Sequence, residues 1–266
     1  MGLPIFVVDA FTSEPFGGNP AGVVLDHGDE AWMQRVAAEM RHSETAFVRP
    51  RAEKSAYDLR WFTPEVEVSL CGHATLASAH VLFDTGRAAK TETIVFQTRG
   101  GELRATDAGR DGVTLDFPIS RPTPLATADA GLYAALRLEP GEFLESDGDF
   151  FVCVVDDAAT VRALDPDFAA LRALDHVRGV YVTAPGDKGY DIVSRCFGPR
   201  VGIDEDPVTG SMHCVLAAYW CPRLGKDELR AFQASARGGE LTVRLAGDRV
   251  LLTGRATTVL SGELSD

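Results

Sequence analysis

The stretch that decides the fold is S-L-C-G-H-A-T-L-A-S-A-H-V-L-F, from Ser69 to Phe83. A glycine and a histidine, Gly72 and His73, open this small-residue, apolar segment of helical length. A helix that begins there directs its free backbone N–H groups and the positive end of its dipole towards whatever precedes it. Such a helix start is an anion-binding arrangement, so we expect a helix from Gly72 and an anion site in front of it.

The chain repeats this pattern in its second half. F-T-P-E-V (62–66) precedes the first helix, and F-G-P-R-V (197–201) precedes D-P-V-T-G-S (206–211), which leads into an apolar run from Met212 to Trp220. Two unrelated helices with a glycine at each start would also give these strings. Their common order before a glycine-led helix favours an internal duplication. We expect two similar lobes, each presenting a helix N-terminus to a shared cleft.

The length and the distribution of prolines define the expected lobes. A chain of 266 residues suits two lobes of about 120 to 140 residues each. Three prolines between Pro118 and Pro124 mark the expected boundary, which gives lobes of residues 1–119 and 120–266 with the active site between them. One helix among many short, mostly hairpin-linked strands predicts an α+β fold in which a sheet wraps round the helix.

Charge and motif content exclude several classes of function. A formal net charge of −13 argues against a nucleic-acid or anionic-membrane surface, and no apolar run is long enough to span a membrane. We expect a cytoplasmic protein, because no secretion signal is visible and the five cysteines form no C-x-x-C pair. The histidines lack H-E-x-x-H spacing, so a metal is not expected, and no phosphate-binding glycine motif is present.

Three side chains are candidates for chemistry. Glu44 lies among small and apolar neighbours in H-S-E-T-A-F-V, where partial desolvation would suit it to take and return a proton; the alternative is a strand-edge carboxylate that faces water. His73 would orient a substrate or would be a capping or core histidine. Asp206 would be a second carboxylate in the cleft or a charge at a helix start.

A loop near the N-terminus is a candidate for ligand contact. Residues 15–20, P-F-G-G-N-P, are dense in turn-forming residues between two apolar runs, so their backbone can approach a ligand closely. The alternative is an ordinary surface turn. We expect Asn19 in this loop to contact the substrate.

These motifs resemble one known family. The strings F-T-S-E-P-F-G-G-N-P-A-G-V-V (11–24), H-S-E-T-A-F-V (42–48), F-T-P-E-V-E-V-S-L-C-G-H-A-T-L-A (62–77), E-D-P-V-T-G-S (205–211) and R-G-G-E-L (237–241) are similar to those of the PhzF-like isomerases of phenazine biosynthesis. They run from one end of the chain to the other in the family's order.

The resemblance implies a fold and a set of site residues. The fold is that of diaminopimelate epimerase: two pseudo-symmetric lobes, each a barrel-like, mostly antiparallel sheet around a central helix. A homodimer without a cofactor is also implied. Glu44 matches the family's acid/base glutamate, and His73 and Asp206 match residues that flank the substrate. The residues that match carboxylate-binding helix starts are Gly72, Gly210 and Ser211.

The resemblance also implies a reaction. In the phenazine enzymes the substrate is trans-2,3-dihydro-3-hydroxyanthranilate, and the glutamate moves a proton from one ring carbon to another before a diene tautomerises to a ketone. One carboxylate serves as the base in the first step and as the acid in the second. We therefore expect a cofactor-independent isomerase that acts on a small carboxylate-bearing substrate, with Glu44 as the proton carrier.

Two other functions remain open at this stage. Related epimerases and proline racemases use two cysteines, one from each lobe; Cys71 keeps the first position, whereas the second lobe carries Asp206-Pro207 there. This disfavours a two-thiol racemase and makes Cys71 a buried thiol, but a pair of one cysteine and one carboxylate, in an amino-acid racemase or epimerase, stays open. A non-catalytic small-molecule binder is the other alternative, and a binder has no need of a proton carrier.

Overall fold

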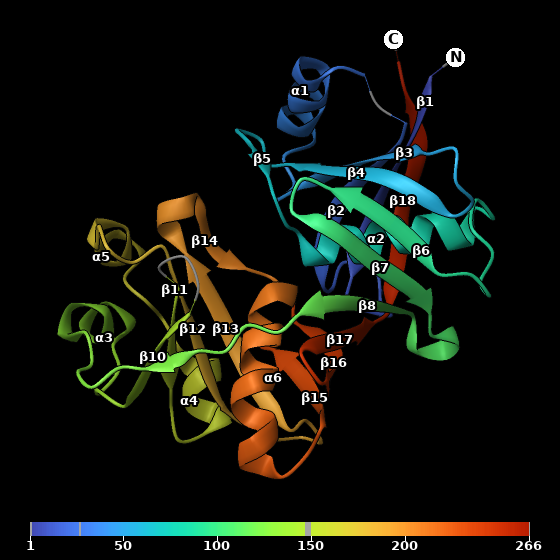
Figure 1. The fold of residues 1–266 in the computed structure, drawn as a ribbon. Coiled ribbons are helices and arrows are strands. Elements are labelled where there is room, and N and C mark those ends of the chain that lie inside the picture. Colours follow the sequence, from blue (N-terminus) through green and yellow to red (C-terminus); the bar gives the residue numbers. More distant parts are fainter. Residues whose placement is uncertain (1, 27, 147–149, 266) are drawn as a thin grey trace. The chain divides into compact units, whose positions relative to one another are not determined.

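The structure is a computed structural model that describes residues 2–26, 28–146 and 150–265 (Figure 1). The chain divides into two compact units: unit 1 is Met1–Phe117 with Leu251–Asp266, and unit 2 is Pro118–Val250. The chain first passes from unit 1 to unit 2 after Phe117, close to the predicted boundary after residue 119. The predicted second lobe, residues 120–266, extends too far at its end, because Leu251–Asp266 belong to unit 1. Strand β18 (Ala256–Leu264) pairs antiparallel with β1 (Leu3–Ala10) and so joins that unit.

Unit 1 holds one central and one peripheral α-helix together with a mixed sheet. Besides β1 and β18, its elements are β2 (Asn19–Leu25), α1 (Glu30–Met40), β3 (Thr45–Pro50), β4 (Ala56–Phe62), β5 (Glu67–Val68), α2 (Gly72–Asp84), β6 (Ile94–Thr98), β7 (Gly101–Asp107), the 3-10 turn η1 (Gly109–Asp111) and β8 (Val113–Pro118).

Unit 2 repeats this mixture with more helices at its periphery. Its elements are β9 (Thr123–Pro124), α3 (Ala130–Leu136), β10 (Glu142–Ser146), β11 (Phe150–Val154), α4 (Ala158–Ala163), α5 (Phe168–Ala173), β12 (Gly179–Pro185), β13 (Ile192–Gly198), the 3-10 turn η2 (Pro199–Val201), β14 (Ile203–Asp206), α6 (Gly210–Leu224), β15 (Glu228–Gln233), β16 (Gly239–Ala246) and the first residues of β17 (Arg249–Gly254), whose remainder belongs to unit 1.

The two units have the same strand topology. In unit 1, β1–β2 is antiparallel, β2–β3 parallel, β3–β4 and β4–β5 antiparallel, β4–β6 parallel and β6–β7 antiparallel. In unit 2, β10–β11 is antiparallel, β11–β12 parallel, β12–β13 and β13–β14 antiparallel, β13–β15 parallel and β15–β16 antiparallel. The order of pairings is identical, as expected for an internal repeat.

The two F-x-P-x-V strings occupy equivalent turns. Phe62 ends β4 and Phe197 lies at the end of β13, and both rings are fully buried. Each string then turns the chain into a short antiparallel strand, closed in the first case by a hydrogen bond from Thr63 N to Val66 O and in the second by one from Gly202 N to Pro199 O. The repeated string therefore builds the turn that leads into each central helix.

Helix α2 is the core of unit 1. It begins at Gly72, as predicted, and nearly all its residues are buried because strands β1, β2, β3, β7 and β18 pack round it (Figure 1). Small residues let strands approach on every side, which a helix with a polar face would not allow. Helix α6 is longer than the predicted run from Met212 to Trp220. It includes Pro222 and ends at Leu224, and Gly225 after it caps the helix with a left-handed φ of 63°.

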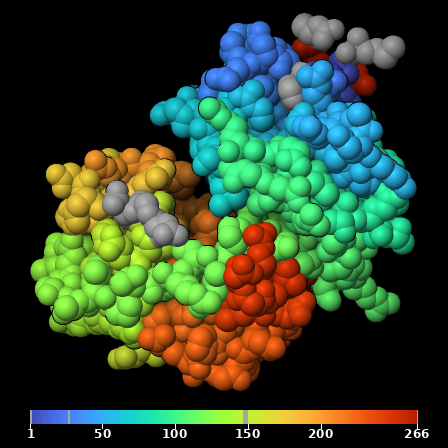
Figure 2. Space-filling view, viewed as in Figure 1, coloured from blue at the N-terminus to red at the C-terminus, as the bar shows by residue number. Residues whose placement is uncertain are grey.

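The peripheral helices cover the outsides of the sheets. Helix α1 buries Met33 and Ala37 and lies at the surface of unit 1 (Figure 2). In unit 2, residues of α3, α4 and α5 such as Leu132, Val161 and Leu171 share one apolar core with strands β10 to β13. Among the described residues, no helix is long and apolar enough to cross a membrane.

Candidate active site

His73 lies in the first turn of α2, and its ring is held in one orientation. The side chain is 6% exposed, and Nδ1 lies 3.2 Å from the amide nitrogen of Asn19. An amide nitrogen only donates, so Nδ1 accepts and the proton of the neutral ring is on Nε2. Burial, and next the charge of His42, lowers the pKa of His73 from 6.5 to about 3, so the ring is neutral near pH 7.

Glu44 faces the protonated nitrogen of this ring. It lies directly before β3, a strand with neighbours on both sides, and its side chain is 14% exposed. Its Oε2 lies 3.4 Å from His73 Nε2, longer than an ordinary hydrogen bond. This exposure agrees with the prediction of a partly desolvated carboxylate and not with a strand-edge glutamate that points to water.

Asn19 is positioned by a constrained loop between β1 and β2. Phe16 N donates to the buried Asp9 Oδ2 at 2.6 Å. Gly18 has a φ of 59°, and a Cβ there would lie 2.1 Å from Ala10 O, so only glycine fits. Asn19 itself is fully buried and bonds to His73. Its observed contact is thus to a site residue, whereas the predicted contact with substrate stays a prediction.

The N-termini of both central helices are not capped by the side chains of their N-cap residues. Cys71 is the N-cap of α2 and Thr209 is the N-cap of α6, and neither side chain caps its helix. Gly72 and Gly210 are the first helical residues, both buried, and Ser211 after Gly210 is exposed. Uncapped backbone N–H groups of the first turn are suited to bind a carboxylate.

The second unit builds a locked turn around Asp206. Thr209 Oγ1 donates to Asp206 Oδ2 at 2.5 Å. The fully buried Gln233 donates to Asp206 O at 2.7 Å and accepts from Thr209 N, also at 2.7 Å. One glutamine therefore ties the carbonyl at the end of β14 to the N-cap of α6, and fixes where the Asp206 carboxylate lies.

His213, one turn into α6, is a structural group in this cluster. Its Nδ1 donates to Thr209 O at 2.8 Å, and Ser194 Oγ donates to Nε2 at 3.3 Å. Burial lowers its pKa from 6.5 to about 4, against the opposing effect of the bond to Thr209. Both ring nitrogens are occupied by protein groups, so the ring supports the helix start.

Comparison with known proteins identifies the family. Residues 8–262 match the family model described as phenazine biosynthesis-like protein, PhzC-PhzF. An uncharacterized isomerase of Pseudomonas aeruginosa is 51% identical over 99% of both chains. The chain belongs to the PhzC-PhzF family.

Solved structures agree with this assignment. A crystal structure of a PhzF family protein from Enterococcus faecalis has a TM-score of 0.93 at 43% identity and covers 100% of both chains. A probable proline racemase from Agrobacterium radiobacter has a TM-score of 0.65 at 16% identity, covering 99% of this chain and 93% of that one, which shows the fold alone. The predicted epimerase-like α+β fold and the predicted family are thus confirmed.

Within this PhzC-PhzF chain the predicted site residues form two groups. Asn19, Glu44, Gly72 and His73 come together in unit 1, and Asp206, Gly210 and Ser211 lie in one turn of unit 2. The cleft that unites the two groups, the homodimer and the cytoplasmic location stay predictions. The position equivalent to Cys71 is Thr209 and not Asp206-Pro207, because both are N-caps of the central helices.

Two features of the site were not predicted from the sequence. Gln233 follows Leu229 and Ala231 on the buried face of β15, and a glutamine in that register marks a buried polar group that needs partners. One donor atom each of Glu44, Cys71 and His73 lies within 4.8 Å of the others, a set that can hold a metal ion. Metal-ligand spacing did not reveal it, because Glu44 is remote in sequence from the other two.

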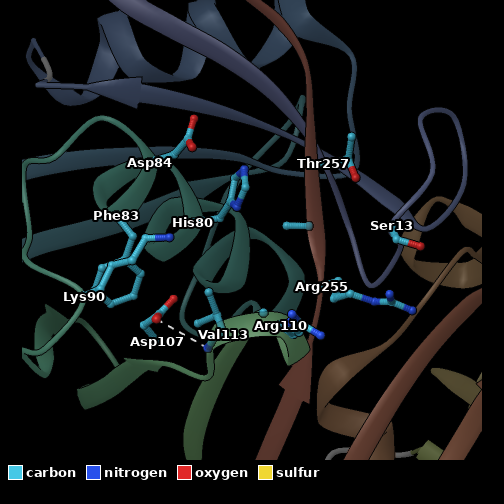
Figure 3. A pocket seen from close by; sticks show the side chains of 13 residues that line it. Ser13, His80, Phe83, Asp84, Lys90, Asp107, Arg110, Val113, Arg255 and Thr257 are labelled. Carbon is cyan, nitrogen blue, oxygen red and sulfur yellow. Dashed lines mark hydrogen bonds between the residues drawn. The ribbon is translucent and has the colours of Figure 1, made fainter.

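A separate hollow lies beside the C-terminal end of α2 (Figure 3). Its volume is about 280 Å³, and its lining mixes charges of both signs, among them Asp84, Lys90 and Arg110. His80 in its wall bonds through Nε2 to Thr258 Oγ1 at 3.1 Å, and burial lowers its pKa. None of the predicted site residues lines this hollow, so it is not the candidate active site.

Proposed function

We propose that this protein is an isomerase that moves a proton between carbons of a small carboxylate-bearing substrate without a cofactor, with Glu44 as the proton carrier. The observation that carries the proposal is the Glu44 carboxylate, mostly buried and 3.4 Å from the N–H of a neutral imidazole at the start of a central helix. Membership of a family whose relatives are named isomerases supports it.

The residues of unit 1 suit a proton shuttle. A desolvated carboxylate is a stronger base than one in water and gives back the proton as an acid in a second step. The Nε2–H of His73 is a fixed donor beside it, suited to hydrogen-bond a substrate oxygen on which negative charge develops. Because the His73 ring is neutral, it does not supply a proton to Glu44 in place of the substrate carbon.

The helix starts supply the second requirement, which is to hold the substrate. A substrate carboxylate bound by backbone N–H groups at the start of α2 would keep the reacting carbon–hydrogen bond near Glu44. Conjugation in the substrate would spread the charge that remains after proton removal. By its resemblance to the phenazine enzymes, a cyclohexadienyl carboxylate such as trans-2,3-dihydro-3-hydroxyanthranilate is the first substrate to test.

A racemase or epimerase of amino acids is the second candidate. The observation in its favour is the Cys71 thiol, which is at the N-cap of α2 and 3.5 Å from His73 Nδ1. The equivalent residue of unit 2 is Thr209, which offers no second thiol. A thiol and a carboxylate would then have to serve as the two opposed bases.

Exchange of carbon-bound hydrogen for deuterium separates these functions. Aromatic, cyclohexadienyl and amino-acid carboxylates are incubated with the protein in deuterium oxide and followed by nuclear magnetic resonance. The proposal predicts exchange with rearrangement, lost in Glu44→Gln and kept in the matched control Glu53→Gln, whose side chain is 69% exposed. Exchange at an α-carbon without rearrangement would favour the epimerase, and binding without any exchange would identify a binder.

A further inference from the structure

Three side chains in unit 1 form a donor set of the kind that zinc prefers. Glu44 offers a carboxylate oxygen, Cys71 a sulfur and His73 a ring nitrogen, and these atoms lie within 4.8 Å of one another. Carboxylate, thiolate and imidazole together are characteristic ligands of zinc, whereas magnesium and calcium prefer sets of oxygens. The set therefore selects a borderline-soft divalent ion.

The distances are close to those of a tetrahedral zinc site. Zinc-to-ligand bonds of about 2.0 to 2.3 Å place neighbouring nitrogen and oxygen ligands about 3.4 Å apart, and nitrogen and sulfur about 3.6 Å apart. His73 Nε2 and Glu44 Oε2 are 3.4 Å apart, and Cys71 Sγ is 3.5 Å from Nδ1 of the same ring. The imidazole and carboxylate thus need little movement, whereas the sulfur lies beside the other ring nitrogen and has to move towards Nε2 for one ion to contact all three ligand atoms.

An independent observation points to a ligand at this place. The side chain of His73 is 6% exposed, and within the described part of the chain its Nε2 has no hydrogen-bond partner, although it is directed at Glu44. A buried polar nitrogen of this kind is normally satisfied. The side-chain amide of Asn19, which contacts His73 Nδ1, has both a donor and an acceptor atom. Rotated by half a turn, this amide would accept a proton from Nδ1 and would support the tautomer in which Nε2 is free to bind a metal.

We propose that Glu44, Cys71 and His73 bind one zinc ion, which blocks the site and inhibits the enzyme. On binding, the Cys71 thiol releases its proton to the buffer and its sulfur bonds to zinc, with no change of oxidation state. Three protein ligands leave the fourth position to water or to a substrate carboxylate. The inhibition rests on the proposed function, because zinc occupies the Glu44 oxygen that would take a proton; the binding does not.

Binding is tested without an assay of activity. The purified protein, stripped with a chelator, is titrated with cobalt(II) chloride and then with zinc chloride, and absorption is recorded. One equivalent of cobalt should give the charge-transfer band of a thiolate ligand, and zinc should remove it. Cys71→Ser should abolish the band, whereas Cys221→Ser, a buried thiol of α6, should keep it. Absence of the band from the unsubstituted protein, or its persistence in Cys71→Ser, would overturn the proposal.

A second variant guards against misfolding of Cys71→Ser. Glu44→Gln keeps the shape of the side chain but weakens it as a ligand, so zinc should bind at least about tenfold more weakly by calorimetry. Equal zinc affinity in Glu44→Gln and in the unsubstituted protein would count against the site. Once a substrate is in hand, micromolar zinc should inhibit and a chelator should restore activity. Cobalt binding with no inhibition would retain the site and contradict its inhibitory role.

Discussion

The starts of α2 and α6 occupy equivalent places in the two units and carry different chemistry. The N-cap is Cys71 in one and Thr209 in the other, and four residues later Thr75 and His213 each bond back to the carbonyl of that N-cap. Unit 1 adds a buried carboxylate beside a neutral histidine. Unit 2 adds a glutamine that locks the turn. The duplicated scaffold therefore supplies two helix starts that their N-cap side chains leave uncapped, whereas the pair of a carboxylate and a neutral histidine lies in unit 1.

The largest effect is expected from changing Glu44, the proposed proton carrier. Glu44→Gln should lower the turnover of a substrate found by exchange about 10²- to 10⁴-fold, the range for loss of a general acid–base group. Asp206→Asn changes the carboxylate of unit 2 and should lower turnover less, if unit 1 carries the proton. Steady-state kinetics of both variants decide this. A greater loss in Asp206→Asn would reverse the assignment of roles.

The turn in unit 2 is tested by removing its glutamine. Gln233→Leu leaves Thr209 N and Asp206 O without their partner, and a buried polar group left unpaired costs about 1 to 3 kcal/mol. The free energy of unfolding, measured in urea, should fall by that amount. Turnover should fall as well, because Asp206 is no longer held. Gln97→Leu, at a partly exposed glutamine of β6, is the control and should change stability little. Similar stability of both variants would show that Gln233 does not hold the turn.

The two buried histidines predict a loss of stability in acid. The folded protein holds the pKa of His213 at about 4, and the unfolded chain has the ordinary value of about 6.5. Between these values the unfolded state binds more protons, so the free energy of unfolding falls as the pH falls from 6.5 towards 4. At pH 5 the loss from His213 is about 2 kcal/mol, and His73 adds a loss of the same sign.

Urea unfolding at pH 7 and pH 5 checks this prediction. The difference between the two pH values should be smaller in His213→Gln than in the unsubstituted protein. The control is His176→Gln, because that exposed ring bonds to Asp129, which raises its pKa, and its removal leaves the acid loss in place. An unchanged difference in His213→Gln would mean that folding does not lower the pKa of this ring.

The smallest effect is expected at the position in unit 1 equivalent to His213. Thr75 Oγ1 donates to Cys71 O at 2.5 Å within the buried first turn of α2. Thr75→Val removes this bond and keeps the shape, so the free energy of unfolding should fall by about 1 kcal/mol without a change in its pH dependence. Urea unfolding at the same two pH values measures both quantities. A loss of unfolding free energy that is larger at pH 5 than at pH 7 would mean that Thr75 affects the pH dependence of stability, as His213 is expected to do.

The start of α2 and the repeated turn could be predicted from the sequence, because each depends on residues that are adjacent in the chain. Gly72 was correctly predicted as the start of α2, and the two F-x-P-x-V strings revealed the repeat, because turn and helix-start chemistry is written in adjacent residues. The return of β18 to β1 was missed, since strand pairing between the two ends of a chain has no local pattern. The hydrogen bonds of Gln233 to Asp206 and Thr209 were not predicted, and neither was the short distance between Glu44 and Cys71. In both cases the residues are far apart in the sequence.

In the proposed mechanism a single carboxylate, Glu44, both removes and returns the proton. It is tested most directly with a substrate that carries deuterium at the carbon to be deprotonated, turned over in ordinary water and analysed by mass spectrometry. Part of the deuterium should reappear at the new position in the product, because the same group carries it there. Product that contains only solvent hydrogen at that position in every turnover would contradict the account and indicate two separate bases.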